Sequence, residues 1–448
     1  MHHDAAHLLS PSLRADPPAD ATVARMLAGA DGPHAIADRI AAVSREMTRW
    51  ETNGGLAGWR PDPSLDPRAA GALTDYLASC QALPDWADPA RIARAEALFM
   101  DMSMLSCTLL FCASLPECYV LPDLSAVLHA AGQLEAHTDY RVRSTAAMIF
   151  PVMLEGGLTT PAGGGVAQTL KVRLIHATIR HLILRGSPED SLGAGPVRPL
   201  AVAGGGIYHT LYAHGWDTAR NGMPCNQEEL AFTLLTFNYV FLRGLRKLGL
   251  GLARQDEEDY LHAWNVLGHV LGIERSLMAD TMEEAERAFA EIQARGRQLV
   301  RAPDPRPALA AALMQAMENE IPLRLLKPFP TLLTRLLCGR DATRDLGLNA
   351  RLPLLSRLLF TGGLAAVRAI DAVVRIFVPG FSISRMLTRV FGYRLVTRFL
   401  MDQTRPLRLP EALLNEVNDA TEQWRHDPKA PRWMNRLEAR LAGRRVTP

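Results

Sequence analysis

The chain has 448 residues, enough for one large hydrophobic core or for two domains of ordinary size. Hydrophobic residues make up 48% of it and charged residues 21%, a balance that excludes an intrinsically disordered chain. The net charge of +2 is close to neutral, so overall charge gives no reason to expect a nucleic-acid partner.

Apolar residues recur every three to four positions along most of the chain, which is the period of an amphipathic helix. Prolines and glycines interrupt this pattern where helices are expected to end, and alternating strand patterns are scarce. We therefore predict a mainly α fold. The predicted helices lie at 21–50, 68–82, 89–114, 122–134, 139–154, 166–185, 226–248, 255–273 and 281–301.

Three regions are predicted along the chain: an N-terminal helical extension at 1–90, a central domain at 91–300 and a basic amphipathic helical region at 301–448. The segment APDPRP at 302–307 indicates the last boundary. From Arg340 to Arg405 there are eleven arginines and four aspartates, without lysine or glutamate, and apolar clusters lie between them. Such a segment can lie on anionic lipid or pack on the core as a helical cap, and the sequence leaves both interpretations open.

The six cysteines include no C-x-x-C pair, which argues against a zinc ribbon, a thioredoxin-type site and covalent haem attachment. No basic stretch followed by an apolar run stands at the N-terminus, so we predict no secretory signal. The best candidate for a membrane span, 199–216, contains three consecutive glycines and two histidines and would make a poor spanning helix. We expect a cytoplasmic protein, either free or associated with a membrane surface through residues 340–405.

One histidine interrupts an otherwise apolar helical stripe in KVRLIHATIRHLILR, Lys171 to Arg185. On a helix, His176 shares a face with Arg173 and Arg180. Such a histidine can be a core residue with satisfied hydrogen bonds. It can also be an iron ligand, because a proximal histidine on an apolar helix is a common way to hold haem and the two arginines suit its propionates.

A second candidate group lies upstream in YRVRSTAAMIFPVM. Arg141 and Thr145 are four residues apart and share a helix face, which continues through Met148, Ile149 and Val152. A cation and a hydroxyl on an apolar strip could line an oxygen-binding pocket. The alternative is a surface arginine beside a threonine that faces its own helix.

Other catalytic motifs find little support in this sequence. His176 and His181 are five residues apart, about 140° around a helix, so they cannot share one metal ion. No H-E-x-x-H or G-x-S-x-G is present, which excludes the usual zinc protease and serine hydrolase motifs. The glycine runs do not form G-x-G-x-x-G, so a dinucleotide site is weakly supported.

Several motifs together resemble the family of latex-clearing proteins and fungal mycophenolic-acid oxygenases. They are Arg141-x-x-x-Thr145, the run from Val172 to Arg180, the run Pro224-x-Asn226-Gln227-Glu228-Glu229-Leu230, and Trp264-x-x-Leu267-Gly268 with Leu271-Gly272-Ile273. The resemblance covers about residues 95–280 and implies a globin-like helical core that binds haem b. By that resemblance His176 would be the iron ligand, Arg173 and Arg180 would contact the haem, and Arg141 and Thr145 would line the oxygen side.

The implied chemistry is oxidative cleavage of a carbon–carbon double bond in an isoprenoid-like substrate, with dioxygen as co-substrate. The chain departs from the family pattern at Ser144, where members can carry a lysine. The family's proposed basic glutamate also has no counterpart at matching spacing; the nearby carboxylates are Asp123, Glu135, Asp139 and Glu155. The alternative is therefore a non-catalytic haem- or lipid-binding protein of the same fold. A more remote alternative is a membrane-surface protein without a cofactor.

Overall fold

The structure is a computed structural model that describes residues 10–102, 104–130, 145, 148–201, 206–300, 302–319, 321, 323–374, 386–387, 390 and 430–441. Within these ranges the protein is helical, and its β structure is limited to one isolated bridge between Val197 and Trp216. The predicted mainly α fold is confirmed.

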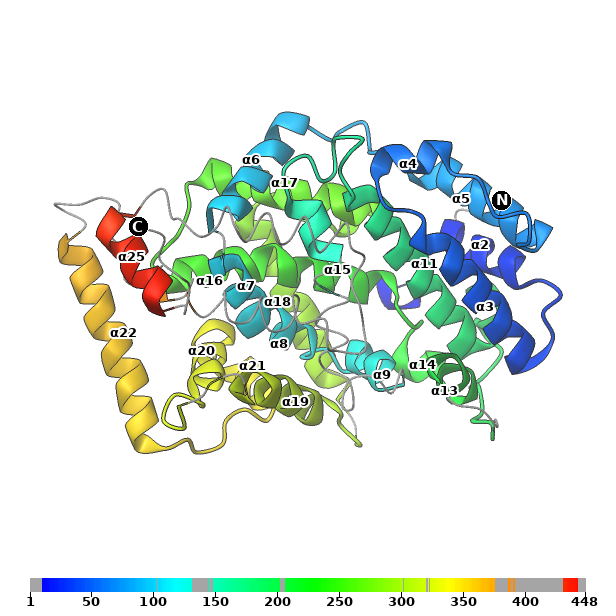
Figure 1. Cartoon of the computed structure of the whole chain (residues 1–448). Helices are drawn as coiled ribbons and strands as arrows, with labels where there is room; N and C mark the ends of the chain where they lie inside the picture. The colour runs from blue at the N-terminus through cyan, green and yellow to red at the C-terminus, as the bar shows by residue number, and fades with distance from the viewer. Residues whose placement is uncertain are drawn as a thin grey trace.

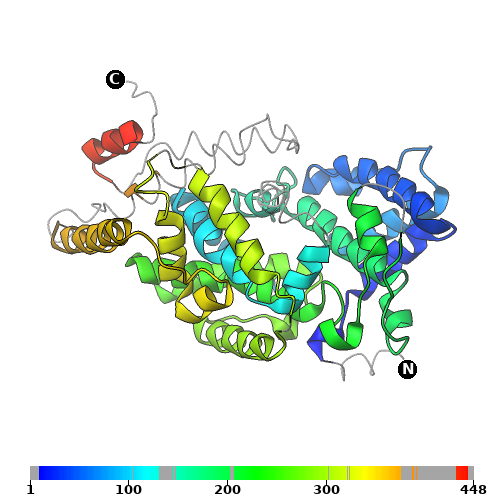
Figure 2. The ribbon, with the colours of Figure 1, turned by 90° about the horizontal axis from the view of Figure 1, so that it is seen from below.

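The N-terminal helices lie at one end of the molecule and the C-terminal helix α22 at the other, as both ribbon views show (Figures 1 and 2). The N-terminal elements are η1 (Pro11–Leu13), α2 (Pro17–Leu27), α3 (Gly32–Thr48), α4 (Asn53–Gly58) and α5 (Pro67–Cys80). The predicted helix at 21–50 is thus two helices. Gly29, whose φ of +78° favours glycine, lies in the turn between them.

The central elements include α11, the helix that carries His176 (Figure 1). They are α6 (Pro89–Met102), α7 (Met104–Leu109), η2 (a π-helix, Leu110–Ser114), α8 (Leu115–Cys118), α9 (Pro122–Ala130), α11 (Gly165–Leu184), α12 (Pro188–Ser191), α13 (Ile207–Ala213), α14 (Thr218–Asn221), α15 (Gln227–Phe237), α16 (Tyr239–Leu248), α17 (Arg254–Val270), η3 (Arg275–Leu277) and α18 (Met282–Gln298). Helix α11 packs against α2, α4, α12, α13 and α17 and lies beside the N-terminal helices (Figure 1). Two further predicted helices are interrupted: 89–114 bends after α6, and 226–248 breaks at Asn238.

One continuous hydrophobic core extends from Ala19 in α2 to Leu348 after α21. Helices of the predicted N-terminal extension contribute to it together with central helices, and α2 packs directly on α11. The boundary near 302–307 falls just before α19, whose Leu309, Leu313 and Met317 are buried in the same core. The division of the chain at 90 and 300 stays a prediction.

The C-terminal region contains α19 (Arg306–Asn319), α20 (Phe329–Cys338), α21 (Arg340–Asp345), α22 (Leu354–Val374) and α25 (Arg432–Leu441). The first of these helices pack on the core, whereas α22 lies at the edge of the molecule (Figures 1 and 2). Leu354, Leu355 and Leu358 on α22 are more than half exposed, at 68%, 58% and 59%. The basic region therefore combines a packed part with a helix that exposes apolar side chains.

No single helix in the described ranges is both long and apolar enough to cross a bilayer. The helices Pro89–Met102 and Leu105–Cys118 meet the length and composition criteria only as a pair, and that pair is bent by 89°.

Candidate functional site

His176 lies in the middle of α11, a helix of 20 residues most of whose apolar side chains pack in the core, although the adjacent Ile175 is 44% exposed. Its ring is half-buried, and its Nδ1 atom is enclosed without a hydrogen-bond partner in the described part of the chain. Burial, reinforced by the Arg180 guanidinium, lowers the pKa of His176 to about 4. The imidazole is therefore neutral at physiological pH, which is the form that can bind a metal.

Arg173 and Arg180 lie on either side of His176, and both form buried ion pairs with the N-terminal helix segment. The Nε and Nη2 atoms of Arg173 donate to the two carboxylate oxygens of Asp16, at 2.6 and 2.7 Å. The Nε atom of Arg180 donates to Asp20 at 2.8 Å. Of these two guanidinium groups, only that of Arg180 retains a buried nitrogen, Nη2, without a partner among the described residues. Arg180 is thus the arginine with a donor left for a ligand.

Arg180 also connects α11 to the start of α15. Its Nη1 atom donates to the carbonyl oxygens of Pro224 and Cys225, at 3.1 and 2.6 Å. Cys225 has a φ of +52°, the left-handed region that residues other than glycine rarely adopt. The run Pro224–Leu230 and the run Val172–Arg180, far apart in the sequence, therefore meet at Arg180.

Glu229, in the first turn of α15, is a buried carboxyl group that forms no ion pair with any residue in the described part of the chain. It is 2% exposed, and neither oxygen makes a hydrogen bond of normal geometry with a described residue. Burial, reinforced by Asp123, raises the pKa of Glu229 well above its ordinary value, and the backbone of Cys225 and the Arg180 guanidinium only partly oppose this. Glu228, the preceding residue, instead pairs with Arg295. Glu229 can therefore hold a proton beside the His176 helix.

This interpretation predicts a difference in pH-dependent stability between the wild type and Glu229→Gln. The unfolded chain ionises Glu229 above its ordinary pKa of 4.5, whereas in the folded chain the raised pKa favours the protonated form. The wild-type free energy of unfolding should therefore fall relative to that of the variant as pH rises above 4.5, by up to ~1.4 kcal/mol per pH unit, until Glu229 ionises in the folded chain. Urea denaturation at a series of pH values measures this slope.

The exposed Glu291 on α18 provides the control, since Glu291→Gln should follow the wild-type curve. Parallel curves for the wild type and Glu229→Gln would mean that Glu229 is ionised in the folded protein.

The predicted oxygen-side residues are only partly described. Arg141, Ser144 and the carboxylates Glu135 and Asp139 lie outside the described residues. Thr145 is described, is helical and is half-buried, and Ile149 and Val152, which follow on the same helix face, are buried. The position of Thr145 is compatible with a pocket lining, and its role stays a prediction.

The nearby carboxylates named from the sequence differ in their environments. Glu155 is exposed. Asp123, at the start of α9, is half-buried, and burial together with Glu228 raises its pKa to about 6. Asp123 is therefore the one of these two that can exchange a proton near neutral pH.

The fold brings three carboxylates to the His176 helix that local sequence patterns do not predict there. Glu229 lies within the motif at 224–230, where the spacing alone carries no sign that its side chain is buried without a partner. Asp16 and Asp20 flank the Pro17-Pro18 pair that starts α2, a pattern that indicates a helix start and nothing more. Their partners are 157 and 160 residues away, so only the folded chain reveals them.

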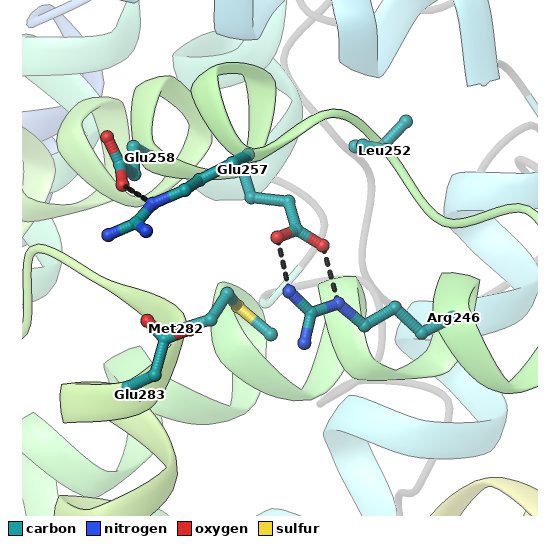
Figure 3. A pocket seen from close by; sticks show the side chains of 7 residues that line it. Arg246, Leu252, Glu257, Glu258, Met282 and Glu283 are labelled. Carbon is teal, nitrogen blue, oxygen red and sulfur yellow. Dashed lines mark hydrogen bonds and ion pairs between the residues drawn. The ribbon is translucent and has the colours of Figure 1, made fainter.

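The other histidines and a surface pocket lie in different surroundings. His209 is half-buried and contacts His34, with 3.4 Å between ring nitrogens. The pocket in Figure 3, ≈ 230 Å³ in volume, lies between α16, α17 and the start of α18. Its Glu257 is paired with Arg246 and its Glu258 with Arg254. This pocket is a cleft between charged surface residues and contains none of the predicted site residues.

Comparisons with known proteins agree with the resemblance seen in the sequence. The profile of the family described as "ER-bound oxygenase mpaB/B'/Rubber oxygenase, catalytic domain" matches residues 105–369. A rubber oxygenase from Streptomyces sp. (strain K30) is 23% identical over 356 residues, which is 76% of each chain. The structure of latex clearing protein LCP in the closed state superposes with a TM-score of 0.58 at 20% identity, over 93% of this chain and 91% of that one. This last likeness shows a shared fold.

Proposed function

The chain belongs to the family of ER-bound and rubber oxygenases, and on that premise we propose that it is a haem b-dependent oxygenase of hydrophobic, isoprenoid-like olefins. The proposed reaction is oxidative cleavage of a carbon–carbon double bond with dioxygen. A relative named for its action on rubber supports this substrate class. The observation that carries the proposal is the neutral, half-buried imidazole of His176, whose Nδ1 has no hydrogen-bond partner among the described residues.

The donors around His176 fit a haem group. Within the described residues no group of three or more histidine, cysteine, aspartate or glutamate side chains could hold a bare metal ion. Iron in a porphyrin needs a single protein ligand on this side, and one neutral imidazole supplies it. Bound haem would supply the iron that binds and activates dioxygen.

The protein's own residues have distinct roles in this proposal. His176 would hold the iron, and the Nη2 atom of Arg180, which has no partner among the described residues, would donate to a propionate. Arg173 would help to hold α11 in place and would not bind a propionate directly, because Asp16 already accepts hydrogen bonds from two of its donors. Thr145, with Arg141, would orient oxygen by hydrogen bonding. Glu229 would store a proton on its buried carboxyl group.

Haem uptake followed by oxygen consumption tests the proposal. Purified protein loaded with haem should show a Soret band and should consume oxygen with a short isoprenoid alkene, forming carbonyl products. The saturated analogue of the same alkene should give no consumption. A Soret band without olefin-dependent oxygen uptake would favour the alternative, a non-catalytic haem- or lipid-binding protein. No haem uptake would contradict the proposed function and the haem-binding form of the alternative, and would leave a lipid-binding protein.

Membrane contact through the basic C-terminal region is part of the same proposal, with the protein in the cytoplasm and α22 touching lipid. Leu354, Leu355 and Leu358 are exposed beside Arg351 and Arg357. Vesicles of anionic lipid should therefore sediment the protein at low salt and release it at high salt, because salt screens exposed charges.

A variant with serine at the three leucines should bind these vesicles much more weakly at equal charge. Vesicles of neutral lipid are the control for the arginines. Absence of binding at low salt would favour the cap interpretation of this region, in which truncation after Pro307 should yield insoluble protein.

A further inference from the structure

The N-terminal segment Ser10–Leu27, which we name the N-terminal clasp, lies against the motifs identified in the sequence. The Met223 amide donates to the Ser12 carbonyl at 2.8 Å, and the Gln227 amide donates to the Arg14 carbonyl at 3.0 Å. The Gln227 side chain also donates to Ala15 O, at 2.9 Å. These bonds hold the clasp at the start of α15, and α2 then packs on α11 (Figure 1).

Two carboxylates of the clasp meet the arginines that flank His176. Asp16 accepts hydrogen bonds from two Arg173 nitrogens, Nε and Nη2, one on each carboxylate oxygen. This paired geometry makes arginine–carboxylate contacts strong and directional. Asp20 accepts from Arg180 through Oδ1, and its Oδ2 accepts from the Asp16 amide at 3.0 Å. All four side chains are less than 10% exposed. Burial raises the pKa of Asp20, and the adjacent guanidinium opposes this rise and favours the ionised form.

The backbone after α17 leaves room for the Asp16–Arg173 ion pair. Gly272, after α17, has a φ of +90°, and a Cβ atom there would lie 2.4 Å from the Asp16 carboxylate and 2.7 Å from Arg173 Nε. The Val270 carbonyl accepts a further bond from Arg173 at 3.2 Å. A larger residue at position 272 would force this ion pair to shift and would strain the backbone, which gives a physical reason for the glycine in the Leu271-Gly272-Ile273 motif.

We propose that Asp16 and Asp20 are positioning residues of the site: they neutralise the two arginines beside His176 and fix the helix that carries it. This inference rests on the proposed function. The clasp lies outside residues 105–369, the range of the family's catalytic domain. In this chain, part of the electrostatic environment of His176 thus comes from residues 10–27. Without these carboxylates two buried cations would face the imidazole, weaken its bond to iron and favour the ferrous state.

Replacing each carboxylate by its amide tests the proposal in the haem-loaded protein. Asp16→Asn and Asp20→Asn keep the shape and remove the negative charge. We expect either change to raise the midpoint potential by about 59 mV, a tenfold shift of the one-electron equilibrium, at unchanged haem content. Asp75→Asn is the matched control. Asp75 lies on α5 and forms an ion pair at the surface with Arg25, which is on α2. The control should leave the potential unchanged.

A paired replacement separates charge from packing. Asp16→Leu combined with Arg173→Met removes both charges, and apolar replacements of a buried ion pair are often tolerated. The midpoint potential of this double variant should return close to the wild-type value. If the single variants lower the melting temperature and leave the potential unchanged, the clasp is only a scaffold and the proposal is wrong.

Hydrogen exchange of the haem-free protein provides a second test, which does not depend on the cofactor. Amide exchange in α11 should become at least about tenfold faster in Asp16→Asn and Asp20→Asn than in Asp75→Asn, because an unpaired buried arginine loosens the contact between α2 and α11. Equal exchange rates in all three variants would contradict the proposed positioning role of Asp16 and Asp20, whether or not haem binds. Failure of the wild type to take up haem, with the exchange difference present, would instead contradict the proposed function alone.

Discussion

His176→Ala is expected to abolish stable haem binding. The variant removes the only protein–iron bond that the proposed function assigns, so the Soret band should be lost after gel filtration of the reconstituted protein. His181→Ala should retain haem, because a five-residue spacing turns that side chain about 140° away around the helix. Absorption spectra of both variants at equal protein concentration measure the difference.

His176→Leu distinguishes an iron ligand from a structural core histidine. Leucine keeps most of the volume and removes the unpartnered nitrogen Nδ1. A buried polar atom without a partner costs about 1–3 kcal/mol, so the haem-free leucine variant should be as stable as the wild type or more stable. Clear destabilisation of the haem-free protein, or an unchanged Soret band in either His176 variant, would count against the ligand assignment. His209 and His214 would then be the next candidates.

Thr145→Val is expected to reduce olefin cleavage by about 100- to 1000-fold while haem stays bound. Valine keeps the size and branching of threonine, so the helix should persist, and the loss is confined to one hydroxyl. A hydrogen-bond donor placed at developing charge in a dry pocket can stabilise a transition state by roughly 2.7–4 kcal/mol, which corresponds to that loss in rate. Oxygen consumption with the isoprenoid alkene measures the rate, and the spectrum of the cyanide complex should change.

Thr178→Val is the matched control for the threonine experiment. Thr178 is buried on α11 two residues after His176, and its hydroxyl donates to the Leu174 carbonyl of its own helix at 2.8 Å. Its removal should leave both rate and spectrum close to the wild type. Full activity of Thr145→Val would place Thr145 outside the oxygen-binding pocket, and the assignment of His176 would be unaffected.

Local sequence patterns predicted the fold class well, since helix periodicity depends on neighbours three and four residues away. The same patterns were less reliable at the positions where one helix ends and the next begins. The turn containing Gly29 and the break at Asn238 each interrupt an apolar pattern that continues on both sides, so periodicity alone predicted one helix where the structure has two. Periodicity did predict His176 in the middle of an apolar helix, where the structure has it, because no break interrupts the pattern around that residue.

The sequence by itself determined a helical chain, an isolated histidine on an apolar helix and two arginines one turn from it. Only the tertiary structure decided what faces those groups. It brings Asp16 and Asp20 to Arg173 and Arg180, and it buries Glu229 away from any ion-pair partner among the described residues. The reason is physical: the charge state of a buried group depends on the burial and partners supplied by remote segments. A spacing of three or four residues carries no information about a carboxylate 157 residues away.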